Sequence, residues 1–336
     1  MAQMDFSSII ISSKVSLHRN LSSQPFPSRI GASQGLALSK KLADEILPLG
    51  DFKVYTLSTL PRIDCMVMHE KNLITRELIE HYESSAVMLN QSETIAVMLG
   101  GVDHIVLECS MKGLLLGDAY HQIAALDDAI CSKLDIAFDD SLGFLSGNIS
   151  CIGTGMKAKV VMFLPGLVLT GALESLMSNL ATQGMVVSGV YGVETQGVGY
   201  MFEISNARSL GLSEREILSE VASYAYQIAE AEMRARNKLK TGSYDDCLDV
   251  VQRAWGVLTN AHKISISELM KLAGELKMGM SLGLIALKDP MMVDKLITAT
   301  MPYTIQKSAG TELGELERDK MRAVQVSRAL KNIRIK

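Results

Sequence analysis

The sequence of 336 residues has few aromatic residues, few prolines and little net charge. Aromatic side chains make up 5% of it, with 1 Trp, and there are only 7 Pro. The 33 Lys and Arg are balanced by 37 Asp and Glu, which gives a formal net charge of −4. Such a chain has no overall basic field that would attract nucleic acid or an anionic membrane. We therefore expect neither as a partner.

Cysteine is scarce and has no paired spacing. The chain has 5 cysteines without a C-x-x-C pattern, which favours a reducing compartment over a disulfide framework. The 6 His are dispersed, and no two of them stand at ligand spacing with a Cys, so the sequence predicts no metal site. The cysteines are Cys65, Cys109, Cys131, Cys151 and Cys247.

Long hydrophobic runs are also missing. The isoleucines at positions 9–11 form too short a run for a signal peptide. Pro165 and Gly166 interrupt the apolar run Val160–Leu169, which falls short of a membrane span. The sequence therefore predicts a cytoplasmic protein.

The chain does have enough apolar residues for a large core. It is 48% hydrophobic and 21% charged, close to the average of globular proteins, and its length allows two domains. Runs of predicted strands with helices between the groups are typical of an α+β fold with a largely antiparallel sheet. The expected helices are Leu36–Leu47 and Leu115–Leu134, and the expected strands are Ser8–Ser12, Cys65–His69, Ser85–Leu89, Thr94–Leu99, Ile105–Cys109, Val160–Leu164, Val186–Val190 and Tyr200–Ser205.

From Ser213 onward the pattern changes to long helices. Ser213 with Glu216 forms a capping box that opens a helix to about Lys240, and Ser265 with Glu268 opens another. The segment Glu312–Lys331 carries charges at helical spacing. Because residues 241–243 offer a helix end and a loop, we place a domain boundary there, between residues 1–240 and 241–336.

Several segments match motifs of one enzyme family in order and spacing. They are Ser12–Leu21 followed by Pro25–Pro27, Glu70–Ile74, Asp103-His104, Leu134–Leu145, Gly153–Gly155, Leu164–Thr170, Gly189–Gly192, Ile204–Asn206, Gly256–Ala261 and Arg318–Ala323. From about Ile9 to Arg328 the chain thereby resembles the ATP:guanido phosphotransferases, or phosphagen kinases, and among them the bacterial protein-arginine kinases.

The resemblance implies an α+β guanidino-kinase fold, an antiparallel sheet flanked by helices, followed by a helical C-terminal domain. It also implies the transfer of a phosphoryl group from ATP, with Mg²⁺, to a guanidinium group. That reaction needs cations around the phosphates, which arginine forks supply best, and a carboxylate that orients the guanidinium and accepts its proton.

Most positions that match the family's ATP-binding residues lack the expected group. The S-S-R-I-R motif reads Ser-Ser-Lys-Val-Ser here, and only Lys14 and Lys157 keep a positive charge among five changed arginine positions. Losing one phosphate-stabilising arginine can cost roughly 10³-fold in rate. The family's ATP positions correspond to Ser12, Ser13, Lys14, Ser16, Asn72, Val106, Lys157, Lys159 and Ser188.

The positions of the family's catalytic groups are changed as well. Val102 stands at the catalytic glutamate, Asn148 at the reactive cysteine and Val193 at a second acid. Cys151 comes three residues after the cysteine position and Glu194 one residue after the acid, so we expect both to point elsewhere. No catalytic residue is intact, and ATP with Mg²⁺ is expected to bind only if the nucleotide site survives.

The motif R-D-x-x-R-A is intact near the C-terminus. Arg318 and Arg322 are spaced i, i+4 on a predicted helix, so their guanidinium groups could clamp a phosphate; the alternative is a surface helix of ion pairs. In the family this motif forms a phosphoarginine-binding site apart from the active site. The matching residues are Arg318, Asp319, Arg322 and Ala323.

Three further patterns favour structural interpretations. The segment Gly153–Ala158 fits G-x-G-x-x-A, but a strand-like run follows it, which disfavours a dinucleotide site. We expect the pairs Asp127-Asp128 and Asp139-Asp140 to be solvated. For His104 beside Asp103, a structural hydrogen bond is favoured over a catalytic dyad.

Three hypotheses for the function follow. The first is a degenerate kinase that acts as a phosphoarginine-responsive regulator or adaptor in protein quality control. The resemblance suggests phosphoarginine-bearing proteins, an active arginine-kinase paralogue and Clp protease components as partners, and a dimer. The second is an active protein-arginine kinase in which lysines replace arginines, and the third is a purely structural protein.

Overall fold

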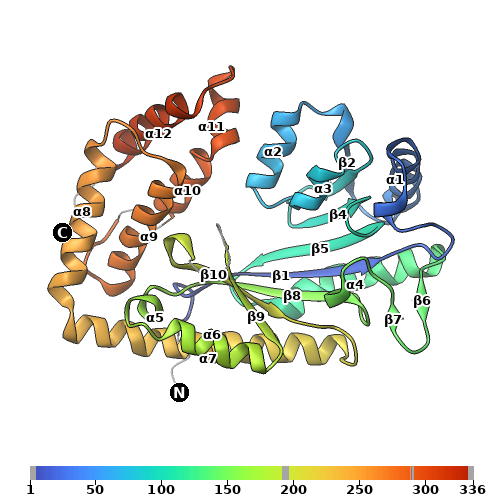
Figure 1. The fold of residues 1–336 in the computed structure, drawn as a ribbon, viewed down its shortest axis with the longest axis horizontal. Helices are drawn as coiled ribbons and strands as arrows, with labels where there is room; N and C mark the ends of the chain where they lie inside the picture. Colours follow the sequence, from blue (N-terminus) through green and yellow to red (C-terminus); the bar gives the residue numbers. More distant parts are fainter. Residues whose placement is uncertain (1–4, 191–196, 288, 290, 332–336) are drawn as a thin grey trace.

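A computed structural model describes residues 5–190, 197–287, 289 and 291–331 of the chain (Figure 1). Its centre is an eight-stranded sheet in the order β2-β3-β4-β5-β1-β8-β10-β9. All neighbouring strands in this sheet are antiparallel, as the sequence predicts. The strands are β1 (Ile10–Arg19), β2 (Phe52–Thr56), β3 (Ala86–Asn90), β4 (Ile95–Leu99), β5 (Ile105–Lys112), β8 (Met156–Phe163), β9 (Met185–Gly189) and β10 (Met201–Asn206), and a separate hairpin contains β6 (Phe138–Asp139) and β7 (Gly143–Phe144).

Helices surround this sheet and form the C-terminal third of the chain. The helices before residue 213 are α1 (Ala32–Ile46), α2 (Arg62–Glu70), α3 (Arg76–Glu80), α4 (Leu116–Lys133), α5 (Pro165–Leu169) and α6 (Leu173–Thr182). Those after it are α7 (Glu214–Gly242), α8 (Tyr244–Asn260), α9 (Ile266–Leu282), α10 (Met292–Ala299), α11 (Pro302–Ala309) and α12 (Glu315–Leu330), and short 3₁₀ helices are η1 (Pro27–Arg29), η2 (Leu47–Leu49), η3 (Leu57–Thr59), η4 (Ile149–Cys151) and η5 (Val198–Tyr200).

The two faces of β1 differ because side chains alternate along a strand. Val15 and Leu17 are buried in the main core, together with residues of α1, α4 and α7. Lys14, Ser16 and His18 lie on the opposite face. This alternation explains why polar and apolar residues are mixed in the sequence of the strand. One face of the sheet is covered by the helices, and the other carries the candidate site.

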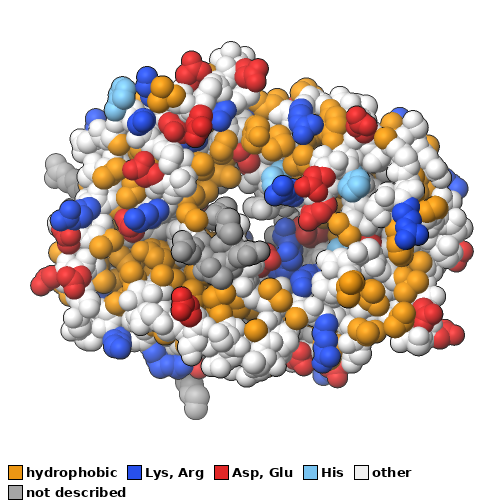
Figure 2. All heavy atoms as spheres, in the orientation of Figure 1, with side chains coloured by type: hydrophobic (Ala, Val, Ile, Leu, Met, Phe, Trp, Pro, Cys, Tyr) orange, Lys and Arg blue, Asp and Glu red, His pale blue; other side chains and the backbone are white. Residues whose placement is uncertain are grey.

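Two smaller cores lie at the two ends of that second face. At one end of the sheet, α2 and α3 cover β3 and β4 through residues such as Cys65, Leu78 and Met98. At the other end, the C-terminal helices pack on Phe163 and Met201. Figure 2 shows the surface hollowed between these parts, with basic and acidic side chains at the border of the hollow.

The long helix α7 carries the chain from the sheet to the C-terminal helices. Ser213 and Glu216 form the expected capping box at its start, with both reciprocal hydrogen bonds present. The chain turns at Ser243 into α8, and Ser265 accepts a hydrogen bond from the Glu268 N–H at the start of α9. The turn lies in the segment where we place the domain boundary, which stays a prediction.

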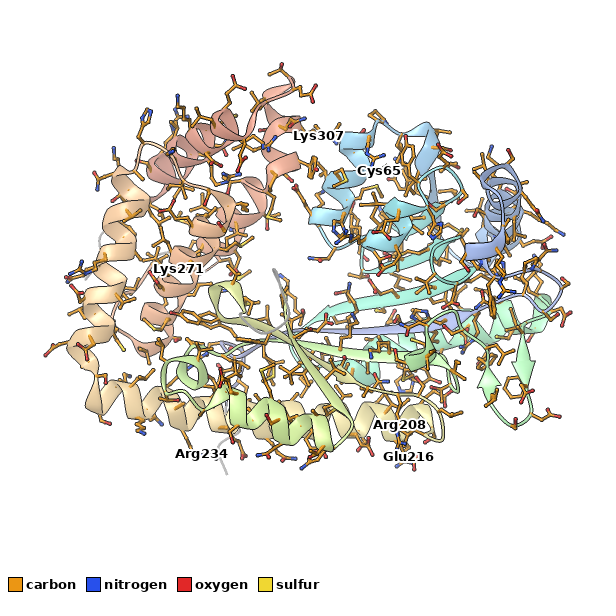
Figure 3. All side chains as sticks on the ribbon, viewed as in Figure 1. Cys65, Arg208, Glu216, Arg234, Lys271 and Lys307 are labelled. Carbon is orange, nitrogen blue, oxygen red and sulfur yellow. The ribbon has the colours of Figure 1, made fainter. Side chains whose placement is uncertain are left out.

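A polar contact joins the C-terminal helices back to α2. The Glu70 carboxylate accepts hydrogen bonds from the backbone N–H groups of Tyr303 (2.7 Å) and Thr304 (2.8 Å), at the start of α11. Lys307 forms an ion pair with Asp64 at 2.8 Å. Figure 3 shows Lys307 on the edge of the C-terminal helices that faces α2. The contact connects two segments that are more than 230 positions apart in the chain.

The structure corrects two of the sequence expectations. Cys65–His69 was expected as a strand but belongs to helix α2, because buried Cys65 and Val67 mimic strand alternation in so short a segment. Asp127 is not solvated: it is buried and forms an ion pair with Arg19 at 2.6 Å, whereas Asp139 and Asp140 are exposed. The strand expected at Ser8–Ser12 continues to Arg19, and the other expected strands and helices are confirmed within a few residues.

A buried ion pair on α7 anchors α5 and predicts a large stability effect. The Glu232 carboxylate accepts hydrogen bonds from the N–H groups of Gly166 (2.9 Å) and Leu167 (2.8 Å) and pairs with Arg236 at 2.7 Å. Breaking one partner of such a pair leaves an uncompensated buried charge, so Glu232→Gln should lower the free energy of unfolding by about 3–5 kcal/mol. Urea denaturation measures it.

The control is Glu230→Gln on the same helix. Glu230 faces Arg234 at 3.8 Å with both side chains largely exposed, and Figure 3 shows Arg234 directed outward. A surface pair of this kind contributes less than about 1 kcal/mol. Equal effects of the two substitutions would contradict the anchoring role of Glu232.

Candidate functional site

Most of the predicted nucleotide positions share one face of the sheet. Lys14 is opposite Lys159 of β8, and Ser16 is opposite Lys157 of β8 and Glu108 of β5. Residues opposite one another on antiparallel strands point to the same side. Val106, opposite His18, and Ser188, opposite Glu203, complete this face. We call Lys14, Ser16, His18, Glu108, Lys157, Lys159, Ser188 and Glu203 the polar face.

Each lysine of the polar face has an internal partner. Lys14 forms an ion pair with Glu108 at 2.7 Å, and Lys159 forms one with Glu203 at 3.0 Å. Lys157 donates a hydrogen bond to the carbonyl oxygen of Asn206. The positive charge on this face is thus largely balanced by two glutamates.

The pKa shifts of the two β8 lysines reflect these partners. Burial lowers the pKa of Lys157 and outweighs the opposite effect of Cys151. For Lys159 burial also acts to lower the pKa, but the charge and hydrogen bond of Glu203, with smaller contributions from Glu108 and Glu77, raise it on balance. Lys159 is therefore held firmly in its charged form by the carboxylates around it.

Several predicted positions lie away from the centre of the polar face. Val106 is buried in the apolar cluster beneath α2 and α3. Asn72 has a positive φ of 57° in the turn after α2 and is exposed. Asn148 is exposed, and its side chain accepts a hydrogen bond from the Ser150 N–H at 3.1 Å.

Val102 lies in the turn between β4 and β5, and Val193 and Glu194 lie outside the described residues. Ser12 is the first residue of β1 that pairs with β5. The Ser13 side chain points to the opposite face, where its hydroxyl donates a hydrogen bond to the Gly113 carbonyl oxygen.

Asp103 joins three segments at the edge of the polar face. Its carboxylate accepts hydrogen bonds from His18 Nδ1 (2.8 Å), Ser146 Oγ (2.7 Å) and the Gly147 N–H (2.7 Å), and also from the Asn20 side-chain amide. The expected neighbour His104 is directed elsewhere: its Nδ1 accepts a hydrogen bond from the Leu21 N–H. His104 thus has a structural hydrogen bond, and Asp103 pairs with His18 instead.

The Cys151 thiol is buried, and its interaction with His18 lowers its pKa, so it lies near the site and not away from it as its spacing in the sequence suggests. The Nε2 atom of His18 is 3.3 Å from Ser16 Oγ. Sequence spacing could not show this, because 133 positions separate residues 18 and 151. The pairing of Glu108 and Glu203 with lysines was missed for the same reason.

The charges of this group depend on one another. Burial acts to lower the pKa of His18, but hydrogen bonds and charges from Asp103 and Cys151 raise it to about 9. Burial acts to raise the pKa of Asp103 and of the Cys151 thiol, and in each case the interactions with His18 outweigh it and lower the pKa. Each of the three groups therefore stabilises the charged form of its neighbour.

The R-D-x-x-R-A residues lie on α12, apart from the polar face. The Arg322 side chain is 1% exposed and donates hydrogen bonds to the carbonyl oxygens of Thr300 (3.0 Å) and Ile264 (2.8 Å) and to Asp319 (2.5 Å). Arg318 is less buried and donates to the Leu313 carbonyl at 2.8 Å. Ala323 is packed in the C-terminal core. Arg322 thus ties α12 to two neighbouring segments in this conformation.

Within the described part of the chain, no cluster of three or more His, Cys, Asp or Glu residues is arranged to hold a metal ion. Among the same residues, no helix combines the length and the apolar character needed to cross a membrane.

Comparison with known proteins identifies the family. Residues 37–235, more than half of the chain, match the model of the ATP:guanido phosphotransferase C-terminal catalytic domain. The chain belongs to the ATP:guanido phosphotransferase family. Residues 245–336 match the protein-arginine kinase McsB C-terminal domain, which places the chain in the bacterial arginine-kinase branch of this family.

Curated relatives support the same branch of the phosphotransferase family. The chain is 34% identical over 324 residues to a protein-arginine kinase of Symbiobacterium thermophilum, covering 95% of this chain and 92% of the relative. It is 32% identical over 327 residues to one of Caldanaerobacter subterraneus, covering 96% and 97%.

Solved structures share the guanidino-kinase fold. Lombricine kinase superimposes with a TM-score of 0.59 at 18% identity, covering 69% of this chain and 68% of that chain. The duplicated taurocyamine kinase of Schistosoma mansoni superimposes with a TM-score of 0.61 at 19% identity, covering 80% and 40%. At these identities the likeness shows the fold alone, and it confirms the expected fold class.

The raised pKa of His18 predicts a pH-dependent contribution to stability. A group whose folded-state pKa is raised stabilises fully below its unfolded-state pKa, about 6.5 here, and loses that contribution as pH rises through about 9. His18→Gln should therefore be less stable than the wild type at pH 6, by up to about 3 kcal/mol, with a smaller deficit near pH 10. Urea denaturation of both proteins across this range measures the difference.

His104→Gln is the control because His104 shifts in the opposite sense. Burial lowers its pKa, so its neutral form is favoured and stability is lost as pH falls from about 6.5 toward that lower value. His104→Gln should remove the loss of stability at acidic pH and leave the stability at alkaline pH unchanged. A pH-independent deficit in His18→Gln would show that His18 acts through packing alone.

Proposed function

We propose that this arginine-kinase-like protein is catalytically impaired and acts as a phosphoarginine-responsive regulator or adaptor. The observation that carries the first part is the pairing of Lys14 with Glu108 and of Lys159 with Glu203. Lys14 stands at one of the positions where a phosphotransferase of this family places an arginine for ATP, and Lys159 lies opposite it on β8.

The polar face fits Mg-ATP poorly. The triphosphate is a multiply charged anion, and its binding depends on cations that are free to contact phosphate oxygens. Here Glu108 and Glu203 occupy two of the lysines and would themselves repel the phosphates. Lysine is also a point charge without the planar fork that grips two oxygens. We therefore derive no phosphoryl-transfer step from this face.

In the part of the chain that the structure describes, the carboxylates at the polar face are engaged by other groups. A guanidinium substrate requires a free carboxylate to orient it and to accept its proton. Val102 supplies an apolar side chain at the position of the family's catalytic glutamate. Glu108 and Glu203 are engaged by lysines, and Asp103 by His18 and three further donors. These commitments support the proposal of impaired catalysis.

A second candidate function is an active protein-arginine kinase with a rewired site. The observation in its favour is that Lys14, Lys157 and Lys159 remain on one face of the sheet. In that case the glutamates would have to release their lysines when a nucleotide binds. The two candidates differ in whether the protein turns over ATP.

The regulatory part of the proposal rests on Arg318 and Arg322. Arg318 is the accessible member of the pair and would contact the phosphoryl group, whereas buried Arg322 would hold α12 in place or exchange Asp319 for the ligand. Phosphoarginine-bearing proteins, an active arginine-kinase paralogue and Clp protease components are the proposed partners. We further propose a cytoplasmic location and a dimeric assembly.

An assay of phosphoryl transfer tests impaired catalysis. The protein incubated with ATP, Mg²⁺ and an arginine-rich substrate should form no acid-labile phosphate above background, because the cations and the carboxylate are not available. The protein-arginine kinase of Symbiobacterium thermophilum, tested in parallel, is the positive control. Clear turnover that Lys14→Ala abolishes would establish the rewired enzyme instead.

A binding titration tests the phosphoarginine response. Phosphoarginine should bind the wild-type protein, and Arg318→Ala should weaken the binding by about tenfold or more, because a charge-assisted bond is lost. Arg328→Ala is the matched control, since Arg328 is an exposed arginine on the same helix. Isothermal calorimetry measures all three proteins. Absence of binding to the wild type, or equal losses in both variants, would refute the role of Arg318.

A further inference from the structure

A cleft lies between helix α11 and helices α2 and α3, where the C-terminal helices meet the far end of the sheet. Its volume of about 630 Å³ is within the usual range of ligand-binding pockets, which often lie between two parts of a protein. None of the segments that carry the family resemblance contains the following residues. We call it the α2–α11 cleft, and the side chains that line it include Arg62, Ile63, Met66, Ile79, Tyr303 and Gln306.

Two polar contacts fix the walls of this cleft relative to each other. At the end of α2, Glu70 accepts hydrogen bonds from the N–H groups of Tyr303 and Thr304 at the start of α11. Near the start of α2, Asp64 pairs with Lys307, which is further along α11. The two helices therefore run antiparallel and side by side (Figure 1).

Arg318 reaches the border of the α2–α11 cleft. Its Nη1 donates hydrogen bonds to the Leu313 carbonyl oxygen at 2.8 Å and to Gln306 Oε1 at 3.4 Å. Gln306 lines the cleft, and so does Glu312, the neighbour of Leu313 in the chain. A phosphoryl group bound by Arg318 would therefore place the rest of its molecule at this cleft.

The cleft combines an apolar wall with a guanidinium group that has no acidic partner. Ile63 and Met66 of α2 and Ile79 of α3 form the apolar wall. Arg62 is exposed, with its guanidinium 5.8 Å from the centroid of the Tyr82 ring. Among the residues that the structure describes, Arg62 forms no ion pair. Its planar fork is thus available to a carboxylate of a ligand.

The other polar groups of the cleft suit a polypeptide backbone. Gln306 Oε1 accepts the hydrogen bond from Arg318, so the Nε2 of the same amide remains to donate to a carbonyl oxygen. The Glu312 carboxylate can accept hydrogen bonds from N–H groups. Free phosphoarginine has no aliphatic side chain to cover the apolar wall, whereas the residues beside a phosphoarginine in a polypeptide can supply one.

We propose that the α2–α11 cleft binds the residues that flank a phosphoarginine in a polypeptide. The ligand is then a segment with an aliphatic side chain and a carboxylate next to the phosphorylated arginine. The phosphoryl group contacts Arg318, the aliphatic side chain packs on Ile63 and Met66, and the carboxylate accepts hydrogen bonds from Arg62. This inference rests on the proposed phosphoarginine response and adds the class of ligand that this response requires.

A ligand in this position would contact both parts of the chain. It would touch α2 and α3 on one side and α11 and Arg318 on the other, and so add to the contacts of Glu70 and Lys307. A ligand that binds only the closed arrangement stabilises it. The N–H groups of α2 and α11 should therefore exchange hydrogen more slowly when the peptide is bound, and free phosphoarginine should protect α11 much less.

The test compares four ligands by isothermal calorimetry with the full-length protein. They are acetyl-Gly-Glu-Leu-phosphoarginine-Leu-Glu-Gly amide, the same peptide without the phosphoryl group, acetyl-Gly-Ser-Gly-phosphoarginine-Gly-Ser-Gly amide, and free phosphoarginine. The first peptide should bind at least about tenfold more tightly than the third and than free phosphoarginine, because it buries a leucine and gains a charge-assisted hydrogen bond.

Two variants locate the gain in affinity. Arg62→Ala should weaken binding of the leucine- and glutamate-containing phosphopeptide by about tenfold and leave the affinity for free phosphoarginine unchanged. Ile63→Ser should weaken binding of the same peptide by about fivefold. Arg215→Ala is the matched control, because Arg215 is an exposed arginine on α7, and it should change no affinity. Arg62 is exposed and Ile63 partly exposed, so both variants should fold.

The outcomes separate this inference from the proposed function. If free phosphoarginine binds as tightly as the first peptide, or if Arg62→Ala and Arg215→Ala have the same effect, the flanking-residue site is refuted and the phosphoarginine response stands. If no ligand binds, or if the unphosphorylated peptide binds as tightly as the phosphorylated one, the phosphoarginine response is refuted and this inference with it.

Discussion

The Asp103 carboxylate is where strand β1, the β4–β5 turn and the loop before β8 are fastened together. It is buried, and an unpaired charge at such a position would cost several kcal/mol. Four donors compensate it: His18 of β1, Asn20 just after β1, and two groups of the Ser146–Gly147 segment. Because His18 is one of them, the position of the loop, the charge of the imidazole and the state of the Cys151 thiol depend on the same carboxylate. The geometry of the polar face follows from this connection.

On the polar face, two of the lysines form ion pairs with glutamates of the same sheet. Salt bridges such as Lys14–Glu108 satisfy groups that a phosphotransferase would leave for its ligand. Partly buried pairs of this kind add little to stability, since desolvation offsets most of the attraction. Their main effect is therefore on binding. A ligand anion gains Lys14 or Lys159 only by displacing a glutamate, which then has no partner.

The sequence predicted the fold well because strand alternation and helix caps are local signals. Ser213 with Glu216 marked the start of α7, and the motif order indicated the family before any coordinates. Local patterns failed at α2, where five residues around Cys65 and Val67 suit either a strand or a helix, and at Asp127, whose partner Arg19 is 108 positions away. The site was predicted as a set of positions but not as a set of contacts. Pairs such as Lys14–Glu108 arise from strand register, and spacing along one sequence does not contain that information.

The bonds between Glu70 and the start of α11, with the Lys307–Asp64 pair, have a consequence for how the molecule comes apart. These contacts join α2, in the first quarter of the chain, to α11 near its end. The chain from α2 through the sheet, α7 and the C-terminal helices is thus closed into a ring by this contact. In such a ring neither part can swing about the α7–α8 turn until the contact at α11 is broken. We expect loosening of one part to destabilise the other, because the C-terminal helices also share a core with Phe163 and Met201 of the sheet.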